Sequence, residues 1–379
     1  MMNKICYILT VPVTVRAFFI PQLKYLSENG FDVSVICSSD DSLQSELGEK
    51  IHFIPVDMPR GLSIFKSISV IRKLIKIFKQ ESFNFIQYST PNAALYGAIA
   101  AKICRVKIRN YHLMGFRYLG AKGILKVILK FLEKITCRLS SSIECVSKSN
   151  LELGVEEGIF AKNKATVVWN GSTGGIDLDR FSIENRTEWR NEIRNKLGYS
   201  KNDFIYGFVG RITKDKGIDE LLEAFLNSAH NAKLLMVGEF ENEQELNHDL
   251  LSNAKSNNQI KFVGAVNDVE KYFAAIDMLV LPSYREGFGN VVIESAAMGT
   301  PAIVSDIPGP RDAVIPNKTA ILVPPNNTMA LENIFSTVSK ETIISLGKEA
   351  ADFSKNNFDQ NILNKYILER KNYLLSNIC

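Results

Sequence analysis

The sequence predicts an α/β protein built from two Rossmann-like domains, each with a doubly wound parallel sheet. Three observations lead to this prediction. A chain of 379 residues exceeds what one hydrophobic core usually organises. Short apolar segments alternate with longer amphipathic segments along the chain. Glycines and turn-forming residues interrupt this alternation in "VVWNGSTGGIDLDRF" (167–181), which predicts a boundary between domains 1–168 and 169–359.

The individual elements follow from the same alternation. In the first half we expect strands over 5–11, 32–37, 85–88, 106–111 and 142–146, and helices over 16–29, 64–80, 92–104, 123–139 and 148–156. In the second half we expect strands over 204–209, 233–237, 259–263, 278–282, 301–305 and 320–323, and a helix over 290–298. Strands that alternate with helices are typical of parallel sheets.

Composition favours a cytoplasmic protein. The six cysteines form no Cys-x-x-Cys pair and lie in apolar stretches, as reduced packing residues do. The apolar run 5–15 lacks the strong basic flank and the cleavage site of a signal peptide. No segment reaches the roughly twenty uncharged apolar residues of a membrane span. We therefore expect a cytosolic chain without a spanning helix.

The net charge of +4 conceals a strongly basic region. Residues 60–140 contain sixteen Lys or Arg and two acids, which indicates a surface that faces something anionic. Cations alternate with apolar residues at helical spacing in 66–79 and 122–138, which favours an anionic membrane surface and argues against nucleic acid. In the second segment the cations recur every four residues, at Lys122, Lys126, Lys130, Lys134 and Arg138. A packed helix with a solvated Lys edge explains 122–138 nearly as well.

The segment "VLPSYREGFGNVVIESAAMGTP" predicts a strand, a glycine-bearing loop and a helix. Such loops bind ligands, because the helix start presents unpaired N–H groups and the positive end of its dipole. Gly287 and Gly289 let an anion approach the backbone. Glu286 and Glu294 can flank one bound ligand, and a carboxylate accepts two hydroxyl hydrogen bonds from a ribose or a hexose. Alone, these two acids would be interpreted as solvated surface residues.

A second anion site is predicted in "IYGFVGRITKDKGIDELLEAF". Arg211 follows the glycine that ends a strand, and Lys216 precedes the glycine that opens the next helix. A guanidinium that forks onto phosphate oxygens and a nearby ammonium together suit a diphosphate. An exposed turn is the alternative interpretation of this pair.

These residues resemble the retaining family 4 glycosyltransferases, whose signature pairs Gly-Arg…Lys-Gly with Glu-Gly-Phe-Gly-x-x-x-x-Glu. Here the two parts are Gly210-Arg211…Lys216-Gly217 and Glu286-Gly287-Phe288-Gly289…Glu294, in the expected order. The elements "NGSTGGIDLDRF" and "SDIPGPRDAV" are similar to further parts of the family pattern. The sequence departs from the family in "TVPVTVRAFF", which replaces a frequent Gly-Gly, in Asp312, where Glu is more usual, and in "NKTA" before the last strand.

The resemblance implies a role for each matched residue. Arg211 and Lys216 would hold the diphosphate, Glu294 the ribose hydroxyls and Glu286 a hydroxyl of the donor sugar. The amides of Phe288, Gly289 and Asn290 would complete these contacts, and backbone near Val266 would face the base. His112 in "RNYHLMGF" matches the histidine that reaches the donor, and it also follows a predicted strand. Thr10 and Arg16 are the candidate acceptor contacts.

The resemblance further implies the GT-B fold, in which two Rossmann-like domains face each other across a cleft and a helix over 360–379 completes the first domain. The expected donor is a nucleotide-diphosphate sugar, with UDP preferred and a hexose or N-acetylhexosamine transferred. The expected acceptor is a polyprenyl-diphosphate-linked saccharide in bacterial capsule or O-antigen assembly, on the inner face of the cytoplasmic membrane. The cations would replace a metal, so no cofactor is expected, and front-side attack is favoured over double displacement.

Other functions stay open on the sequence. A dinucleotide-dependent dehydrogenase should show Gly-x-Gly-x-x-Gly at its first helix, and that motif is absent. A nucleotide-sugar epimerase or a phosphorylase shares the architecture, and an inactive transferase could act as a carbohydrate-binding scaffold. The Asp177-Leu178-Asp179 triplet imitates the Asp-x-Asp metal motif of the other glycosyltransferase fold, but it lies in the interdomain element and is not assigned to metal.

Overall fold

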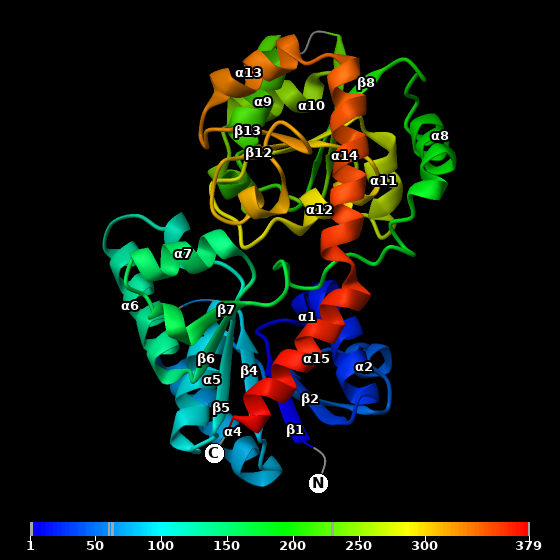
Figure 1. Cartoon of the computed structure of the whole chain (residues 1–379). Helices are drawn as coiled ribbons and strands as arrows, with labels where there is room; N and C mark the ends of the chain where they lie inside the picture. Colours follow the sequence, from blue (N-terminus) through cyan, green and yellow to red (C-terminus); the bar gives the residue numbers. More distant parts are fainter. Residues whose placement is uncertain (1–2, 60, 62–63, 229–230, 378–379) are drawn as a thin grey trace. The chain divides into compact units, whose positions relative to one another are not determined.

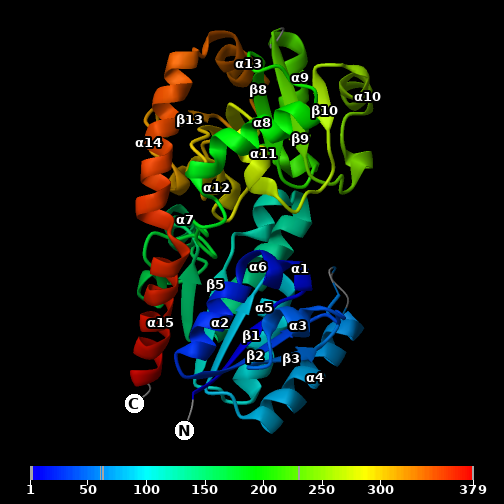
Figure 2. The same cartoon turned by 90° about the vertical axis from the view of Figure 1, so that its right-hand side faces the viewer.

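The computed structural model describes residues 3–59, 61, 64–228 and 231–377 (Figures 1 and 2). The chain divides into two compact units, Met1–Gly174 with Asn361–Cys379 (unit 1) and Gly175–Gln360 (unit 2). Each unit contains one parallel sheet, of seven strands in unit 1 and six in unit 2. The prediction of two Rossmann-like α/β domains is confirmed.

The division between the units lies later than the expected 168/169 boundary, because 169–174 pack within unit 1. Trp169 stacks on Tyr366 with ring centroids 5.9 Å apart. The amide of Ser172 donates to the carbonyl of Val146 at 2.7 Å. These contacts hold the segment against strands and a helix of unit 1, so the chain leaves that unit only at Gly174.

The sheet of unit 1 has the order β3-β2-β1-β4-β5-β6-β7. Its strands are β1 (Asn3–Ile8), β2 (Phe31–Cys37), β3 (Ile51–Pro55), β4 (Phe85–Ser89), β5 (Ile108–Leu113), β6 (Ser142–Cys145) and β7 (Ala165–Val167). Its helices are α1 (Pro12–Phe18), α2 (Ile20–Glu28), α3 (Leu43–Leu47), α4 (Ile64–Glu81), α5 (Pro91–Ile103), α6 (Gly123–Leu139), α7 (Lys148–Glu156) and α15 (Gln360–Ser376).

Two hydrophobic cores lie on the opposite faces of this sheet. Alternate residues of β1 enter different cores, with Cys6 and Ile8 on one side and Ile5 and Tyr7 on the other. The first core is covered by α4, α5 and α6, and the second by α1, α2, α3 and α15. Burial on both faces explains why these strands are apolar almost throughout.

The sheet of unit 2 has the order β10-β9-β8-β11-β12-β13. Its strands are β8 (Phe204–Val209), β9 (Ala232–Val237), β10 (Ile260–Phe262), β11 (Met278–Leu281), β12 (Ala302–Ser305) and β13 (Ala320–Val323). Its helices are α8 (Arg186–Lys196), α9 (Ile218–Ser228), α10 (His248–Ser256), α11 (Val269–Ala275), α12 (Asn290–Ala297), α13 (Thr328–Thr337) and α14 (Lys340–Phe358).

Several details differ from the predicted elements. The helix expected over 16–29 is two helices, α1 and α2, and each has a proline in its first turn. Because Pro12 starts α1, the strand expected to reach residue 11 ends at Ile8. Strands β3 and β7 were not among the predicted elements, nor were helices α3, α8, α10, α11, α13 and α14. In the described part of the chain, no helix is both long and apolar enough to cross a bilayer.

Candidate active site

The two predicted anion-binding loops lie side by side in unit 2. They follow β8 and β11, which are neighbours in the sheet and pair in parallel. Gly217 has a φ of +70°, and a Cβ atom there would lie 2.2 Å from the carbonyl oxygen of Pro282. Only glycine allows this approach, so the loop after β8 presses directly on the end of β11.

The close approach brings Lys216 to Glu286. Their side chains form an ion pair of 2.5 Å and are 16% and 13% exposed. The same carboxylate oxygen of Glu286 accepts a hydrogen bond of 2.9 Å from Ser283. Glu286 is therefore fixed by a cation and by the buried hydroxyl of Ser283, while the side chains of Lys216 and Glu286 keep some exposure through which a ligand can reach them.

A further set of contacts locks the two loops together. Arg285 forms an ion pair of 2.7 Å with Asp215. The amide of Tyr284 donates to the carbonyl of Asp215 at 2.9 Å, and its phenol donates to Glu220 at 2.6 Å. Sequence reasoning missed these residues, although all four lie inside the quoted motifs.

Arg211 lies at the end of β8 but does not contact Glu286. Its guanidinium pairs with Glu241, and the Arg211 side chain is 60% exposed. Next to it, Gly238 has a φ of +137°, and a Cβ atom there would lie 1.9 Å from the carbonyl oxygen of Gly210. The ends of β8 and β9 thus meet backbone to backbone, which leaves the Arg211 side chain accessible beside them. A glycine directly after a predicted strand was the signal for this contact.

The start of α12 lies in the second loop. Gly289 occupies the N-cap position with a φ of +88°, a conformation that glycine adopts at little cost. Phe288 is buried and packs edge-on against Phe358, with centroids 5.3 Å apart. The loop is therefore anchored by an aromatic side chain, and α12 begins at Asn290 as predicted, one residue after Gly289.

Glu294 lies within α12 and is partly buried. Burial raises the pKa of Glu294 to about 7, the nearby Glu270 adds to this, and the positive charge of Arg180 opposes it. Arg180 also pairs with Glu270 at 2.9 Å and donates to the carbonyl of Asn267 at 2.7 Å. Arg180 therefore acts on Glu294 through its charge and also binds the loop that contains Val266, near which the backbone is predicted to face the base. Sequence reasoning missed Arg180 and Glu270.

His112 lies in unit 1. It is the penultimate residue of β5, not beyond the strand as expected, because β5 continues to Leu113. The side chain is buried, and its ring meets that of Phe19 edge-on at 5.5 Å. Burial lowers the pKa of His112 to about 4. The imidazole is accordingly held in its neutral form.

The two candidate acceptor residues are engaged by other parts of unit 1. The hydroxyls of Thr10 and Thr90 are hydrogen-bonded at 2.8 Å. Arg16 binds Asp40 at 2.6 Å and Glu46 at 2.8 Å, which raises the pKa of Arg16 and lowers that of Asp40. In the structure, Arg16 thus fastens α1 to the segment that contains α3. Among the described residues, no group of three or more His, Cys, Asp or Glu is arranged to hold a metal ion.

Comparison with known proteins bears on this site. The model described as "Glycosyltransferase Family 4" matches residues 22–180, and the one described as "Glycosyl transferases group 1" matches residues 190–360. The capsular polysaccharide biosynthesis glycosyltransferase CapM of Staphylococcus aureus is 30% identical over 348 residues, which cover 90% of either chain. The chain belongs to glycosyltransferase family 4.

Other relatives of this family 4 glycosyltransferase agree with the assignment. An Escherichia coli protein named UDP-Gal:alpha-D-GlcNAc-diphosphoundecaprenol alpha-1,3-galactosyltransferase is 23% identical, and the match covers 90% of this chain and 89% of that one. The structure of Anabaena HepE in complex with UDP superposes with a TM-score of 0.77 at 19% identity, covering 98% of this chain and 100% of that one. The fold is GT-B, as the resemblance implied.

Proposed function

We propose that this glycosyltransferase moves a hexose or an N-acetylhexosamine-type sugar from a UDP-linked donor to a lipid-linked saccharide, with retention of configuration, in surface-polysaccharide assembly. One observation carries the proposal: Arg211, Lys216 and the start of α12 lie at the ends of adjacent strands, where they can meet a diphosphate. The Escherichia coli relative is named for a UDP-linked donor and a diphosphoundecaprenol acceptor, and CapM is named for capsule synthesis. These names support the proposed donor, acceptor and pathway class.

On binding the donor, Arg211 would exchange its carboxylate partner for the phosphate oxygens of the donor. The pair of Arg211 with Glu241 is exposed, so the guanidinium can turn to phosphate oxygens at little cost. Lys216 holds Glu286, whose free oxygen can accept from a hydroxyl of the sugar. The carboxylate of Glu294 would accept from the ribose, backbone near Val266 would face the base, and the amides of Phe288, Gly289 and Asn290 would complete the contacts.

Transfer would proceed by front-side attack. The bond between the anomeric carbon and the β-phosphate oxygen breaks, and its electrons pass to the phosphate. Arg211, Lys216 and the α12 dipole stabilise this charge without a metal. The leaving phosphate takes the proton of the acceptor hydroxyl, whose oxygen bonds to the same face of the carbon. Glu286 is already bound by Lys216 and Ser283, which favours a binding role over a nucleophilic one. His112 would contact the donor sugar, as the family resemblance implies.

The direct experiment offers UDP-, GDP- and dTDP-linked hexoses and N-acetylhexosamines with a polyprenyl-diphosphate saccharide in liposomes. Mass spectrometry should detect one added sugar from a UDP donor, and NMR of the product should show the anomeric configuration of the donor. Release of an isomerised nucleotide sugar would indicate an epimerase, and a requirement for inorganic phosphate would indicate a phosphorylase. Absence of any turnover with all donors would favour the carbohydrate-binding scaffold.

The acceptor side of the proposal rests on α6. Five large apolar side chains on α6 are exposed, namely Ile124, Leu125, Val127, Ile128 and Phe131. Ile124 is 80% and Val127 67% exposed. A helix packed on its sheet through this face would bury them, so the exposure favours the membrane interpretation over a solvated Lys edge. Lys122, Lys126, Lys134 and Arg138 are exposed on the same helix, whereas Lys130 pairs with Glu157 at 2.7 Å.

A second surface of the same kind occurs on α4. Phe65 is 88% and Ile68 44% exposed. Its cations Lys66, Arg72, Lys73, Lys76 and Lys79 are all exposed. Apolar side chains that insert beside cations suit an anionic lipid surface, where each cation contributes about 1 kcal/mol. These exposed residues support the proposal that the enzyme binds peripherally to the inner face of the cytoplasmic membrane.

Liposome flotation tests this placement. Binding should rise with the fraction of anionic lipid and fall with salt. Replacing Lys122, Lys126 and Lys134 by Glu should weaken binding while donor hydrolysis in solution stays normal. The matched control replaces Lys340, Lys348 and Lys355 of α14, which are exposed in unit 2, by Glu. Equal loss of binding in both variants would show only a net-charge effect and would contradict the assignment to α6.

A further inference from the structure

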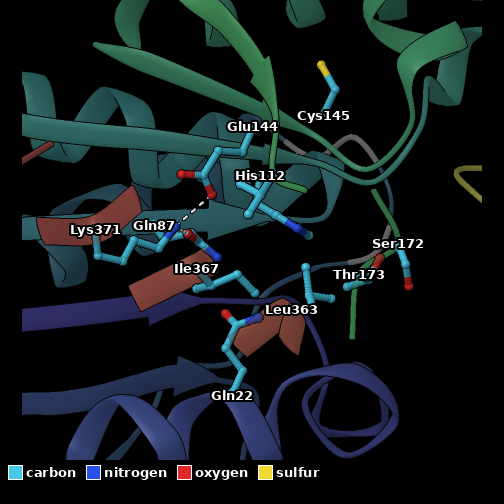
Figure 3. Close-up of a pocket in the computed structure, with 11 residues that line it drawn as sticks. Gln22, Gln87, His112, Glu144, Cys145, Ser172, Thr173, Leu363, Ile367 and Lys371 are labelled. Carbon is cyan, nitrogen blue, oxygen red and sulfur yellow. Dashed lines mark hydrogen bonds and ion pairs between the residues drawn. The ribbon is translucent and has the colours of Figure 1, made fainter. Parts of the chain in front are cut away.

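A buried charge network crosses the sheet of unit 1 beneath α15 (Figure 3). Lys371 of α15 is 1% exposed. Its ammonium donates to Glu144 of β6 at 2.6 Å and to Gln87 of β4 at 2.7 Å. Gln87 also accepts from Asn110 of β5 at 3.0 Å, so the network connects three adjacent strands to the C-terminal helix.

Such a network is expensive to bury. Two charges withdrawn from water lose their hydration, and a well-packed apolar pair would often be as stable. Gln87 accepts one hydrogen bond from the Lys371 ammonium, and the centroid of the Phe85 ring lies 5.2 Å from that ammonium. A purely structural role does not require these charges, so a functional role through a neighbouring residue explains them better.

The neighbour of this network is His112. His112 and Glu144 are paired residues of adjacent parallel strands, so their side chains leave the same face of the sheet. Both line a small cavity with Gln22, Thr173 and Lys371, and Figure 3 shows His112 beside Glu144 in it. Within the part of the chain that the structure describes, no side chain or backbone atom is hydrogen-bonded to Nδ1 of His112. An unpartnered, buried ring nitrogen thus lies next to the ion pair.

The charges that face His112 act in opposite directions. Burial lowers the pKa of His112, the carboxylate of Glu144 raises it, and the ammonium of Lys371 lowers it. Arg370 of α15 approaches the other oxygen of Glu144 at 3.7 Å. The residues of β4 and of 172–173 that lie near His112 are uncharged. The residue between α1 and α2 that contacts its ring is Phe19. Lys371 therefore cancels a carboxylate that would otherwise draw a proton onto the imidazole.

We propose that Lys371 and Glu144 are positioning residues, whose paired charges beside His112 keep its imidazole a neutral hydrogen-bonding group for the donor sugar. Through Lys371, α15 contributes to the reaction although it supplies no catalytic residue. The inference rests on the proposed function, because it takes His112 as the residue that contacts the sugar.

The test compares Lys371→Met, Glu144→Gln and the double variant. In Lys371→Met the carboxylate of Glu144 loses its closest counter-charge, although Arg370 stays at 3.7 Å, and it should raise the pKa of His112, so the imidazole gains a proton at a higher pH. Because the neutral form is the active one, the acid limb of kcat/KM should move to higher pH, by at least one unit. Well below the shifted pKa, kcat/KM should fall about tenfold for each pH unit, because the fraction of neutral imidazole falls by that factor. Glu144→Gln should leave the acid limb in place or move it to lower pH.

Two readouts separate positioning from stability. The double variant removes both charges and should recover thermal stability, so an acid limb restored to its original pH supports the proposal. NMR of ¹⁵N-histidine protein reports His112 directly, since the chain has four histidines and His112→Gln identifies its signal. His112 should stay neutral between pH 5 and 8 in the unmodified protein and titrate within that range in Lys371→Met.

An unchanged acid limb together with an unchanged His112 titration in Lys371→Met would overturn the proposal. Failure of the proposed function looks different. In that case His112→Gln would keep normal transfer, while the NMR titration of His112 would still respond to Lys371→Met. If Lys371→Met does not fold, a movement of the acid limb to higher pH in Glu144→Gln would still contradict the proposal.

Discussion

The two sheets carry polar side chains at the carboxyl ends of their strands, but they hold them differently. In unit 2, Arg211 and Lys216 pair with carboxylates at positions that solvent reaches, and Arg211 is 60% exposed. In unit 1, Lys371 and Glu144 are 1% and 4% exposed in their side chains. The first set can exchange its carboxylates for a ligand, whereas the second set is too deeply buried to do so.

Two carboxyl groups make the same contrast. Lys371 compensates for the burial of Glu144, so the pKa of Glu144 stays below its usual range. Among the described residues Glu294 of unit 2 forms no ion pair, and burial raises its pKa to about 7 although the charge of Arg180 opposes this. The carboxylate of Glu144 is committed to Lys371, whereas the partly buried carboxyl of Glu294 is available to a substrate. Four predictions follow from this difference, in order of decreasing effect.

The largest effect should come from breaking the buried pair. Glu144→Ala leaves the Lys371 ammonium without its counter-charge and should lower the free energy of unfolding by about 3–5 kcal/mol. Glu294→Ala is the matched control in unit 2 and should cost less than about 1 kcal/mol. Urea denaturation of both variants measures the difference. Equal destabilisation would remove the distinction between the two carboxyls.

The next effect concerns turnover. Arg211→Ala removes a charge-assisted contact to the diphosphate and should cost about 2–4 kcal/mol of transition-state binding, or roughly two to three orders of magnitude in kcat/KM. Lys318→Ala is the control, because Lys318 is an exposed cation paired with Glu349 at the amino end of β13. Steady-state kinetics should show normal rates for the control. A normal rate for Arg211→Ala would refute the assignment of the diphosphate.

A smaller effect is expected from pH. The folded-state pKa of Glu294 lies above its unfolded value, so its contribution to stability is present below about pH 4.5 and is lost as pH rises to about 7. If the ionised carboxylate accepts from the ribose, the donor KM should fall severalfold as pH rises through 7. Glu294→Gln should flatten this dependence and gain stability relative to the unmodified protein at pH 8. A donor KM with the same pH profile in both proteins would contradict the role.

The smallest effect is expected from chelation. Since Arg211, Lys216 and the α12 dipole are placed to neutralise the leaving diphosphate, EDTA should change the rate by less than about twofold. The measurement is initial-rate transfer with and without EDTA, with added magnesium as the reversal control. Complete loss of activity in EDTA that magnesium restores would show that Arg211 and Lys216 do not neutralise the leaving diphosphate.

The same contrast explains how far the sequence could be interpreted. The donor loops of unit 2 are local: a strand, two glycines and a helix start lie within a short segment, and β8 and α12 begin where predicted. The resemblance also selected His112, although it lies inside β5. The partners of Lys371 could not be found this way, because Glu144 is 227 residues away and α15 looks like a polar surface helix. Packing, not pattern, decides which of its cations is buried.

Strands β3 and β7 illustrate the same limit. β3 contains His52 and Pro55 and lies at the edge of its sheet, where alternation is weak. β7 has three residues, too few to show a period. The salt bridges of Arg16 could not be predicted from the sequence either, because Asp40 and Glu46 lie in a segment for which no helix or strand was predicted.

The central claim is that the loops of unit 2 bind the nucleotide diphosphate and that the buried network of unit 1 does not. Calorimetric titration of UDP tests it directly. Arg211→Ala should weaken UDP binding more than tenfold, whereas the Glu144→Gln, Lys371→Met double variant and Lys318→Ala should bind UDP within about twofold of the unmodified protein. Unchanged affinity in Arg211→Ala, or a comparable loss in the double variant, would contradict the account.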